Sequence, residues 1–505
     1  MLYISKKVKT FSSHLLTVSM ASASLLITAC SNDNPAANIN DAELLSMVSA
    51  AGLTGNPTAS RTLPAITDAK AQLGKKLFFT KGLGGDNDSA CVTCHHPSLG
   101  GGDGLSLSIG VGAESPDLLG PGRFHSFDVA EADGSLFDGG PTVPRNAPTT
   151  FNIAMWDQAL FHDGRVESLG KTAGANGDDG EGIRTPDSDF GVADPNAAND
   201  TLAAAQSRFP VTSPEEMHGF SLPAQINNDI IRNELAIKLA GDVDWVAEFE
   251  AAFGKDIIIT YTHIAEAIGE YERSQVFVNS PWKAYFEGDA AAISESAKRG
   301  AMLFFESIED GGANCTSCHS GDFFTDEQYH VLATPQIGRG KGDNNGILMN
   351  DDFGRFRESK VATDMYRFRT PSLLNVEVTG PWGHAGAYTT LENMVRHMLN
   401  PAEAIVNYDF SQLDSSANIQ FSNMHTNTQF ALDQLEANRT NNVAEVHQNV
   451  TFTDDDVIDL VEFLKALTDP CVKDRDCLAP WIPDTGETGP DGFQLNAVDN
   501  TGVFF

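Results

Sequence analysis

The sequence predicts a mainly α-helical protein made of two similar halves with long loops. Apolar residues recur at helical spacing in several stretches, most clearly at residues 222–278 and 453–467. Strand signals are sparse, and 45 glycines among 505 residues indicate many loops. The segment Leu77-Phe78-Phe79 also has a counterpart at Leu303-Phe304-Phe305, each within a helical stretch that leads into a glycine-rich approach. Such a repeat is typical of an internal duplication.

Each half carries one C-x-x-C-H motif, Cys91-Val92-Thr93-Cys94-His95 and Cys315-Thr316-Ser317-Cys318-His319. Paired thiols at this spacing bond covalently to the vinyl groups of a haem, and the following histidine binds the iron. A zinc site built from the two Cys pairs is the alternative. It is disfavoured because zinc ribbons separate their pairs by roughly 15–20 residues. The motifs therefore predict two covalently bound c-type haems in two cytochrome-c-like domains arranged in tandem.

The N-terminus has the features of an export signal. Residues 1–30 contain three lysines at positions 6–9, an apolar stretch and the ending Ile27-Thr28-Ala29-Cys30. That ending resembles the lipobox of bacterial lipoproteins, in which Cys30 would be lipidated; an ordinary cleaved signal is the alternative. Because Ser31 follows, we expect a periplasmic or cell-surface protein anchored by lipid to the outer membrane. Residues 31–63 would form a tether with one short helix.

Composition and cysteine use exclude some partners. The net charge of −36 argues against nucleic acid and against an anionic membrane surface. No internal apolar stretch is long enough to span a membrane, so a lipid anchor would be the only membrane attachment.

Of seven cysteines, Cys471 and Cys477 remain after the haem motifs and Cys30, and in an oxidising compartment they are predicted to form a disulfide.

The expected domain borders follow from breaks in the helical pattern. The N-terminal haem domain is predicted at residues 64–280 and the C-terminal haem domain at 281–480, followed by a tail at 481–505. Residues 174–200 form a Gly-, Asp- and Asn-rich insertion without the spacing of a calcium-binding EF-hand, which we interpret as a solvated acidic loop.

Further motifs add a family resemblance. Phe161-His162-Asp163-Gly164-Arg165, the turn at 381–386 and the paired turns at 145–149 and 369–375 stand in a specific order around the haem motifs. Together they resemble the bacterial di-haem cytochrome c peroxidases over roughly residues 64–470. The sequence looks more like the MauG branch of that superfamily, whose members oxidise a protein partner.

The resemblance implies two unequal haems. The N-terminal haem, with His95 below the iron, would meet hydrogen peroxide, and the C-terminal haem, with His319 below, would store and relay electrons. Some relatives close the first haem with a distal histidine, but the matching stretch at 137–141 contains none. This implies an open peroxide site, although His125 lies near enough in sequence to reach over.

A general acid/base is also implied. In the family, a glutamate six residues after a proline and just before a methionine transfers the proton within peroxide. Pro210 and Glu216-Met217 match this spacing. Glu215 is the neighbouring candidate, and a plain surface carboxylate is the other alternative.

The second iron would have its own distal ligand. The resemblance to the MauG branch points to Tyr388, whose phenolate oxygen would stabilise high-valent iron better than a thioether. Met394 or Met398 is the competing ligand, with Tyr388 then only packing.

Two other features are implied by the family with less sequence support. A calcium ion would be bound by the Asn146 side chain and by the backbone carbonyls of Arg369 and Pro371. The electron-relaying tryptophan of the family is replaced by His162, so Trp156 or Trp382 would be substitutes. The resemblance also implies that a glutamine of the family's peroxide pocket is replaced here, near Thr172.

These expectations combine into one function. The chain would be an exported di-haem peroxidase that reduces hydrogen peroxide at the N-terminal haem and oxidises a protein partner through a paired high-valent di-haem state. One alternative is a peroxide-detoxifying cytochrome c peroxidase that receives electrons from a small cytochrome c or a cupredoxin. A second alternative is a non-catalytic di-haem electron-transfer cytochrome.

Overall fold

The structure is a computed structural model. It describes residues 40–126, 143–177, 179–197, 200–220, 227–341, 351–414, 419–443 and 446–505. Ile39–Phe505 form one compact unit. The predicted signal peptide with Cys30, the predicted distal stretch at 137–141 and the first part of the tether lie outside the described residues.

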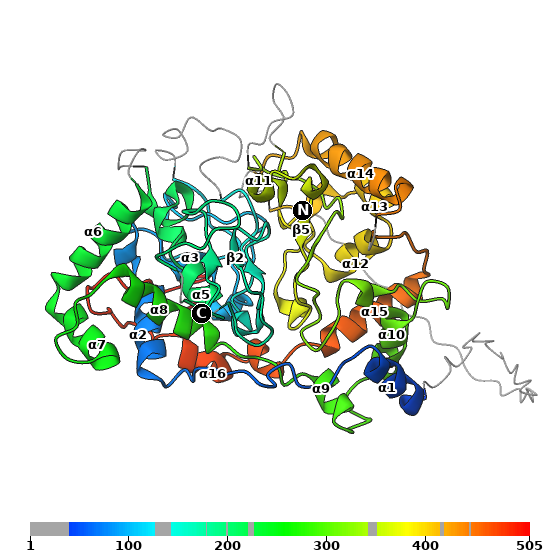
Figure 1. The fold of residues 1–505 in the computed structure, drawn as a ribbon, viewed down its shortest axis with the longest axis horizontal. Helices are drawn as coiled ribbons and strands as arrows, with labels where there is room; N and C mark the ends of the chain where they lie inside the picture. The colour runs from blue at the N-terminus through cyan, green and yellow to red at the C-terminus, as the bar shows by residue number, and fades with distance from the viewer. Residues whose placement is uncertain are drawn as a thin grey trace, which may run out of the picture. The chain divides into compact units, whose positions relative to one another are not determined.

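The fold is mainly α-helical, as the sequence predicts (Figure 1). The helices are α1 (Asp41–Ala50), α2 (Ala69–Phe79), α3 (Cys91–Cys94), α5 (Leu202–Gln206), α6 (Asn228–Ala240), α7 (Val243–Phe253), α8 (Tyr261–Arg273), α9 (Pro281–Phe286), α10 (Glu295–Phe305), α11 (Phe356–Ser359), α12 (Leu391–Leu399), α13 (Pro401–Val406), α14 (Met424–Thr440), α15 (Asp454–Ala466) and α16 (Arg475–Leu478).

The strands are short and form two small antiparallel sheets. The first has the order β1 (Ala159–Leu160), β2 (Val166–Ser168), β3 (Ile183–Arg184), and the second pairs β4 (Tyr329–His330) with β5 (Phe368–Arg369). β5 is close in sequence to the predicted turn at 369–375, and its pairing with β4 holds that turn beside the second haem motif.

Helices α2, α6, α7 and α8 of the first half share one hydrophobic cluster. α2 packs along α8, and α5, α6 and α7 pack around this pair. Leu77, Phe78, Ile264 and Ile268 are all at most 1% exposed and form the centre of the cluster. α2 leads directly toward α3, so this packing positions the first haem motif.

The second half has a separate cluster built in the same way. α10 packs along α15, and α12 and α1 pack beside them (Figure 1). Phe277 belongs to the first cluster and the adjacent Val278 to the second. The change of cluster lies close to the predicted border at 280/281, and two domains remain our interpretation of the chain.

The two ends of the described chain pack on opposite halves. Leu44 and Val48 of α1 are fully buried in the second cluster. The segment after α15 instead returns to the first half, where Leu478 and Leu495 are each 1% exposed in the first cluster. Cys471 and Cys477 form a disulfide at the start of this returning segment. The predicted tail at 481–505 is therefore part of the core of the first half.

The acidic insertion is more ordered than the sequence suggests. Its residues Ile183–Arg184 form β3, and Ile183 is fully buried. Arg184 donates to Glu358 at 2.8 Å, and the Asp157 carboxylate accepts from the backbone N–H of Asn176 at 2.9 Å. The interpretation of the whole stretch as a solvated loop is therefore wrong for these residues, because β3 completes a sheet.

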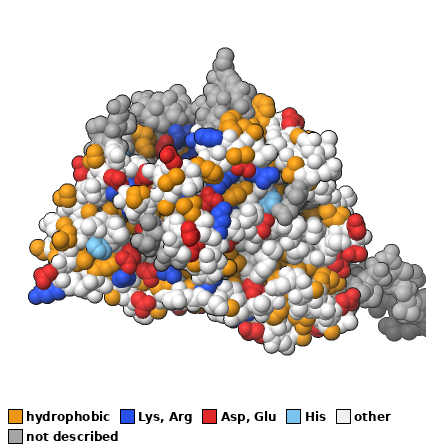
Figure 2. Space-filling view, viewed as in Figure 1, with side chains coloured by type: hydrophobic (Ala, Val, Ile, Leu, Met, Phe, Trp, Pro, Cys, Tyr) orange, Lys and Arg blue, Asp and Glu red, His pale blue; other side chains and the backbone are white. Residues whose placement is uncertain are grey.

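The surface carries charges of both signs. Figure 2 shows acidic and basic side chains interspersed with uncharged and apolar ones on the face in view. Among the described residues, no helix combines the length and the apolar character that a membrane span requires.

Candidate functional site

The first C-x-x-C-H motif forms the one-turn helix α3 and the residue that follows it. The Nδ1 atom of His95 lies 3.1 Å from the carbonyl oxygen of Gly101. A ring nitrogen that donates to a carbonyl leaves the other nitrogen, Nε2, free to bind a metal. Burial raises the pKa of both Cys91 and Cys94, so the free thiols are protonated at neutral pH.

A cavity opens beside this motif. It is lined by both thiols, by His95 and by residues from several other segments, including Arg145, Phe161, His162, Arg165, Gln206, Pro210, Glu216, Met217, Glu272 and Lys341. Most of the exposed lining is apolar. The predicted pair Pro210 and Glu216 therefore lies in the same cavity as His95.

Glu216 lies on a short π-helical turn, Pro214–His218. The turn is held by Ser89, whose hydroxyl donates to the Glu216 carbonyl at 2.7 Å. Gly110 lies against the turn, and a Cβ atom there would stand 2.4 Å from the same carbonyl oxygen, so only glycine permits this approach. Burial raises the pKa of Glu216, while Arg165 and Lys341 oppose that rise.

The neighbouring candidate, Glu215, is directed elsewhere. Its Oε1 atom accepts from Nη2 of Arg339 at 2.6 Å, and Glu215 does not line the cavity. Because an acid/base must reach the reacting proton, the geometry favours Glu216 of the two.

Gln206 is a cavity residue that sequence reasoning missed. It ends α5, and it lines both the first cavity and the larger second one. Thr172, near which the sequence predicts that a pocket glutamine is replaced, is exposed just before the insertion and donates its backbone N–H to Asp179. The position of Gln206 four residues before Pro210, at the end of a short helix, was the available signal.

The second motif has the same construction. Nδ1 of His319 lies 3.0 Å from the carbonyl oxygen of Phe324. Burial raises the pKa of Cys315. A larger cavity surrounds Cys315, Cys318 and His319, and its exposed lining is again mainly apolar.

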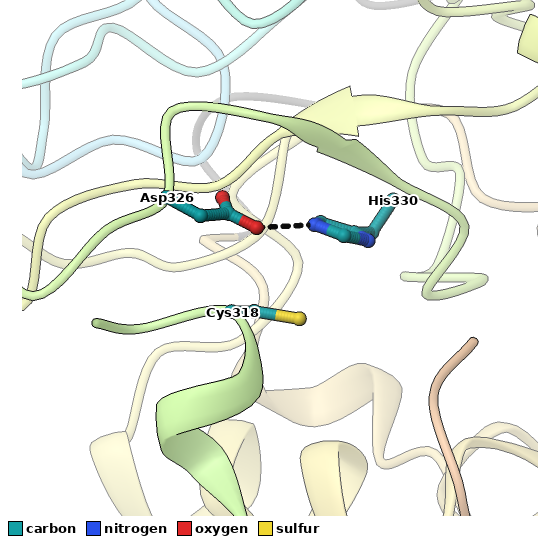
Figure 3. Close-up of side chains that lie close together, drawn as sticks. All are labelled: Cys318, Asp326 and His330. Carbon is teal, nitrogen blue, oxygen red and sulfur yellow. Dashed lines mark hydrogen bonds and ion pairs between the residues drawn. The ribbon is translucent and has the colours of Figure 1, made fainter. Parts of the chain in front are cut away.

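Beside Cys318 lies a half-buried ion pair. Figure 3 shows the Asp326 carboxylate directed at the His330 ring, with the Cys318 sulfur facing the same space. His330 Nε2 lies 2.7 Å from Asp326 Oδ2. Burial would lower the pKa of His330, but the hydrogen bonds to Asp326 and Cys318 raise it to about 10. These three side chains could together hold a metal, but Cys318 belongs to the haem motif, so we assign no metal to them.

The structure places Tyr388 away from the predicted ligand position. Its hydroxyl is 2.9 Å from His397 Nδ1, and its ring is buried in a cluster with Tyr408 and Met424. Tyr388 does not line the cavity of the second motif, whereas Met394 and Met398 do. The physical reason is that Tyr388 precedes α12 and pairs with Trp382, while the two methionines lie one turn apart on α12 itself.

His162 lies between the two cavities and lines both. Its Nε2 atom is 3.0 Å from the carbonyl oxygen of Asn146. Burial, together with Arg145, lowers the pKa of His162 to about 3, so the ring is neutral. Trp156 and Trp382 line only the second cavity. Of the three predicted relay residues, His162 is the one that borders both sites.

The residues of the predicted calcium site lie together in the larger cavity. The side-chain nitrogen of Asn146 donates to the carbonyls of Leu105 at 2.9 Å and Ser106 at 3.2 Å, which directs its amide oxygen away from them. The carbonyl of Pro371 also acts on His319, raising its pKa against the effect of burial. The oxygen set suits calcium, and its occupancy by an ion remains a prediction.

The other histidines have local partners. His125 pairs with Ala113 and does not line the first cavity. His96 packs its ring against Phe79 and Phe505. His384 lines the second cavity and stacks on Phe368 at 3.9 Å.

Both sites fit covalent haem. Each offers two reduced thiols, a histidine whose Nδ1 is already occupied by a backbone carbonyl, and an apolar cavity beside it. This donor set is the one that c-type haem requires.

Comparison with known proteins agrees with this geometry. A family model described as di-haem cytochrome c peroxidase matches residues 68–291. The methylamine utilization protein MauG of Methylorubrum extorquens is 28% identical over 340 residues, which cover 67% of this chain and 70% of that protein. Cytochrome c551 peroxidase of Pseudomonas aeruginosa is 27% identical over 337 residues, covering 66% and 73%.

Two solved structures are similar in fold. The diheme peroxidase BthA of Burkholderia thailandensis aligns with a TM-score of 0.50 at 22% identity, covering 88% of this chain and 93% of that one. A MauG-like protein associated with microbial copper homeostasis aligns with a TM-score of 0.51 at 21% identity, covering 83% and 96%.

Proposed function

The chain is a member of the di-haem cytochrome c peroxidase family, and on that premise we propose that it reduces hydrogen peroxide at the first haem site with Glu216 as the acid/base. The observation that carries the proposal is the position of Glu216 in the same buried cavity as Cys91, Cys94 and His95. Electrons would enter through the second haem site from a donor protein, as the names of the peroxidase relatives suggest.

Glu216 transfers the proton between the two peroxide oxygens in this proposal. Its carboxylate takes a proton from one peroxide oxygen and returns it to the other, which then leaves as water. Burial raises the pKa of Glu216, which favours the protonated form that returns the proton to the leaving oxygen. Gln206 and His162 also line the cavity, which supports a role for them in orienting peroxide. When bound, the two haems supply the iron chemistry and the electrons.

The first site is open in this proposal. Within the described chain, His95 and His162 are the only histidines that line the cavity, and the sequence at 127–142 contains no histidine. His162 is held by the Asn146 carbonyl. The oxidised protein should therefore accept peroxide without prior reduction.

A methionine of α12 closes the second site in this proposal. Met394 packs against the cluster that contains Tyr388, while Met398 belongs to no such cluster among the described residues. Met398 is therefore the first choice as distal ligand and Met394 the second. A thioether in place of a phenolate favours a role in electron transfer over the stabilisation of high-valent iron.

A direct assay tests the proposal. The holoprotein, with both haems attached, should oxidise a reduced small cytochrome c or cupredoxin when peroxide is added. A protein with intact haems that consumes no peroxide with any such donor, and whose two irons are both six-coordinate, would instead be the non-catalytic electron-transfer cytochrome.

Oxidation of a partner protein in the manner of MauG is the second candidate. The open first site favours it, and the sequence similarity to MauG is as high as that to the peroxidase relative. The position of Tyr388 on His397 counts against it. Peroxide-dependent loss of Trp or Tyr in a co-purifying protein, detected by mass spectrometry, would favour this candidate over peroxide detoxification.

Two associated features belong to the same proposal. An exported location, periplasmic or at the cell surface with a lipid on Cys30, follows from the sequence of residues 1–30. A calcium ion held by Asn146, Arg369 and Pro371 would be found by metal analysis of the purified protein. Its removal with a chelator should then slow electron transfer between the haem sites.

A further inference from the structure

The first cavity contains a cationic side chain that the proposed mechanism leaves unused, Lys341. It comes from the second half of the chain, on a segment held from several sides. Arg339 on this segment pairs with Glu215 at 2.6 Å, next to Glu216. The backbone carbonyl of Lys341 accepts from Nη1 of Arg357 at 3.2 Å. These contacts fix the segment over the turn that carries Glu216.

The two arginines that line the cavity with Lys341, Arg145 and Arg165, already contact other groups. Arg145 is neutralised by two buried carboxylates, Asp163 at 2.5 Å and Asp352 at 2.6 Å. The guanidinium of Arg165 lies 3.5 Å over the Phe161 ring and contacts Asp163 at 3.3 Å. Within the described residues, the ammonium of Lys341 has no hydrogen bond or ion pair that would occupy it.

We propose that Lys341 is the anion-binding group of the peroxide pocket and stabilises the hydroperoxide anion that forms when Glu216 removes a proton. The inference rests on the proposed function and adds a substrate-binding residue to it. The step breaks one O–H bond: peroxide and the Glu216 carboxylate become hydroperoxide and the Glu216 carboxylic acid, with one negative charge on each side. The ammonium faces that charge before and after the transfer.

The charged groups around Lys341 predict that its binding of anions depends on pH. Burial, with repulsion from Arg165 and Arg145, lowers the pKa of Lys341 to about 8, although Asp163 and Glu216 oppose this. Lysine loses its charge above its pKa, so anion binding should weaken as the pH rises through about 8. The neutral His162 ring does not titrate in this range, and Arg145 stays charged because Asp163 and Asp352 raise its pKa.

Binding of small ligands to the diferric holoprotein tests this without turnover. Fluoride and azide are the anionic probes and imidazole is the neutral probe, each followed by optical titration. Lys341→Met should weaken fluoride and azide binding at pH 7 by about tenfold, the usual size of one charge-assisted contact. Imidazole should stay within about twofold. Lys341→Arg should restore anion binding, and Lys360→Met, at an exposed lysine, is the matched control.

Several outcomes would overturn the inference. Unchanged anion affinity in Lys341→Met would do so, as would an equal loss for imidazole, which indicates general damage to the pocket. A shifted midpoint potential of the first haem with normal anion affinity would assign Lys341 to the haem carboxylates instead. Because binding needs no turnover, an anion effect in a protein that reduces no peroxide would leave this inference standing and refute the proposed function.

Discussion

Glu216 and Glu215 are adjacent and chemically identical, and their surroundings give them different roles. Glu216→Gln keeps the size and hydrogen-bonding shape of the side chain but removes its proton chemistry. It should lower kcat/KM for peroxide by about 10²–10⁴-fold. Glu215→Gln is the matched control and should cost far less, because Glu215 faces Arg339 outside the cavity. Equal losses in both variants, at equal haem content, would contradict the assignment.

Single substitutions can also identify the ligand of the second iron. Met398→Leu should abolish the methionine–iron charge-transfer band of the oxidised protein, because leucine has no donor atom. Tyr388→Phe should leave this band intact, since the hydroxyl contacts His397. If the band disappears in Met394→Leu instead, Met394 is the ligand. A spectrum that changes only in Tyr388→Phe would restore the tyrosine prediction.

Glu272 gives a prediction about stability. It is 4% exposed on α8, and burial raises its pKa to about 8. A folded pKa above the unfolded value stabilises the fold at low pH, and that stability is lost as the pH rises through the folded pKa. From about pH 5 to 8, the free energy of unfolding should therefore fall by on the order of 3–4 kcal/mol. Glu272→Gln should remove this slope in thermal unfolding, whereas Glu234→Gln, at an exposed position, should keep it.

At the scale of elements, α12 favours a methionine over Tyr388 as the ligand of the second iron. The family resemblance points to Tyr388, but a position in the sequence does not give the direction in which a side chain lies. The spacing of Met394 and Met398 within a helix does, because residues four apart lie on one face. Gln206 was missed for a related reason, since α5 is too short for its helical period to show in the sequence.

The packing of the returning C-terminal segment also could not be predicted from the sequence. Residues 481–505 have no helical or strand period, so nothing in the sequence marks which of them are buried. In the structure Leu495 donates its backbone N–H to the carbonyl of Phe79 at 2.8 Å, and Asp491 accepts from Trp245 at 3.0 Å. The segment thus secures the end of α2, from which the chain continues to the first haem motif.

Leu495→Ala measures that contribution. The side chain is 1% exposed, so truncation should lower the free energy of unfolding by about 2–4 kcal/mol. Val503→Ala, at a side chain that is 60% exposed, is the control and should change stability little. Chemical denaturation of the holoproteins checks this, and equal effects at the two positions would mean that the segment is not part of the core.

At the scale of the whole molecule, the sequence predicts the features that both halves share, and the structure shows how the two halves are connected. The haem motifs, the helices before them and the mainly α fold could be predicted because each depends on local spacing. The crossing of the two ends, with α1 on the second cluster and residues near Leu495 on the first, depends on contacts between distant residues. Lys341 enters the first cavity in the same way, from the other half of the chain.

The central claim is an open first haem site served by Glu216, and one measurement tests it most directly. The diferric holoprotein is mixed with one equivalent of peroxide without any reductant, and the optical and EPR spectra are followed in time. The account predicts a rapid loss of the ferric signal of the first haem, slowed by about 10²–10⁴-fold in Glu216→Gln. A wild-type protein that ignores peroxide until it has been reduced would contradict it.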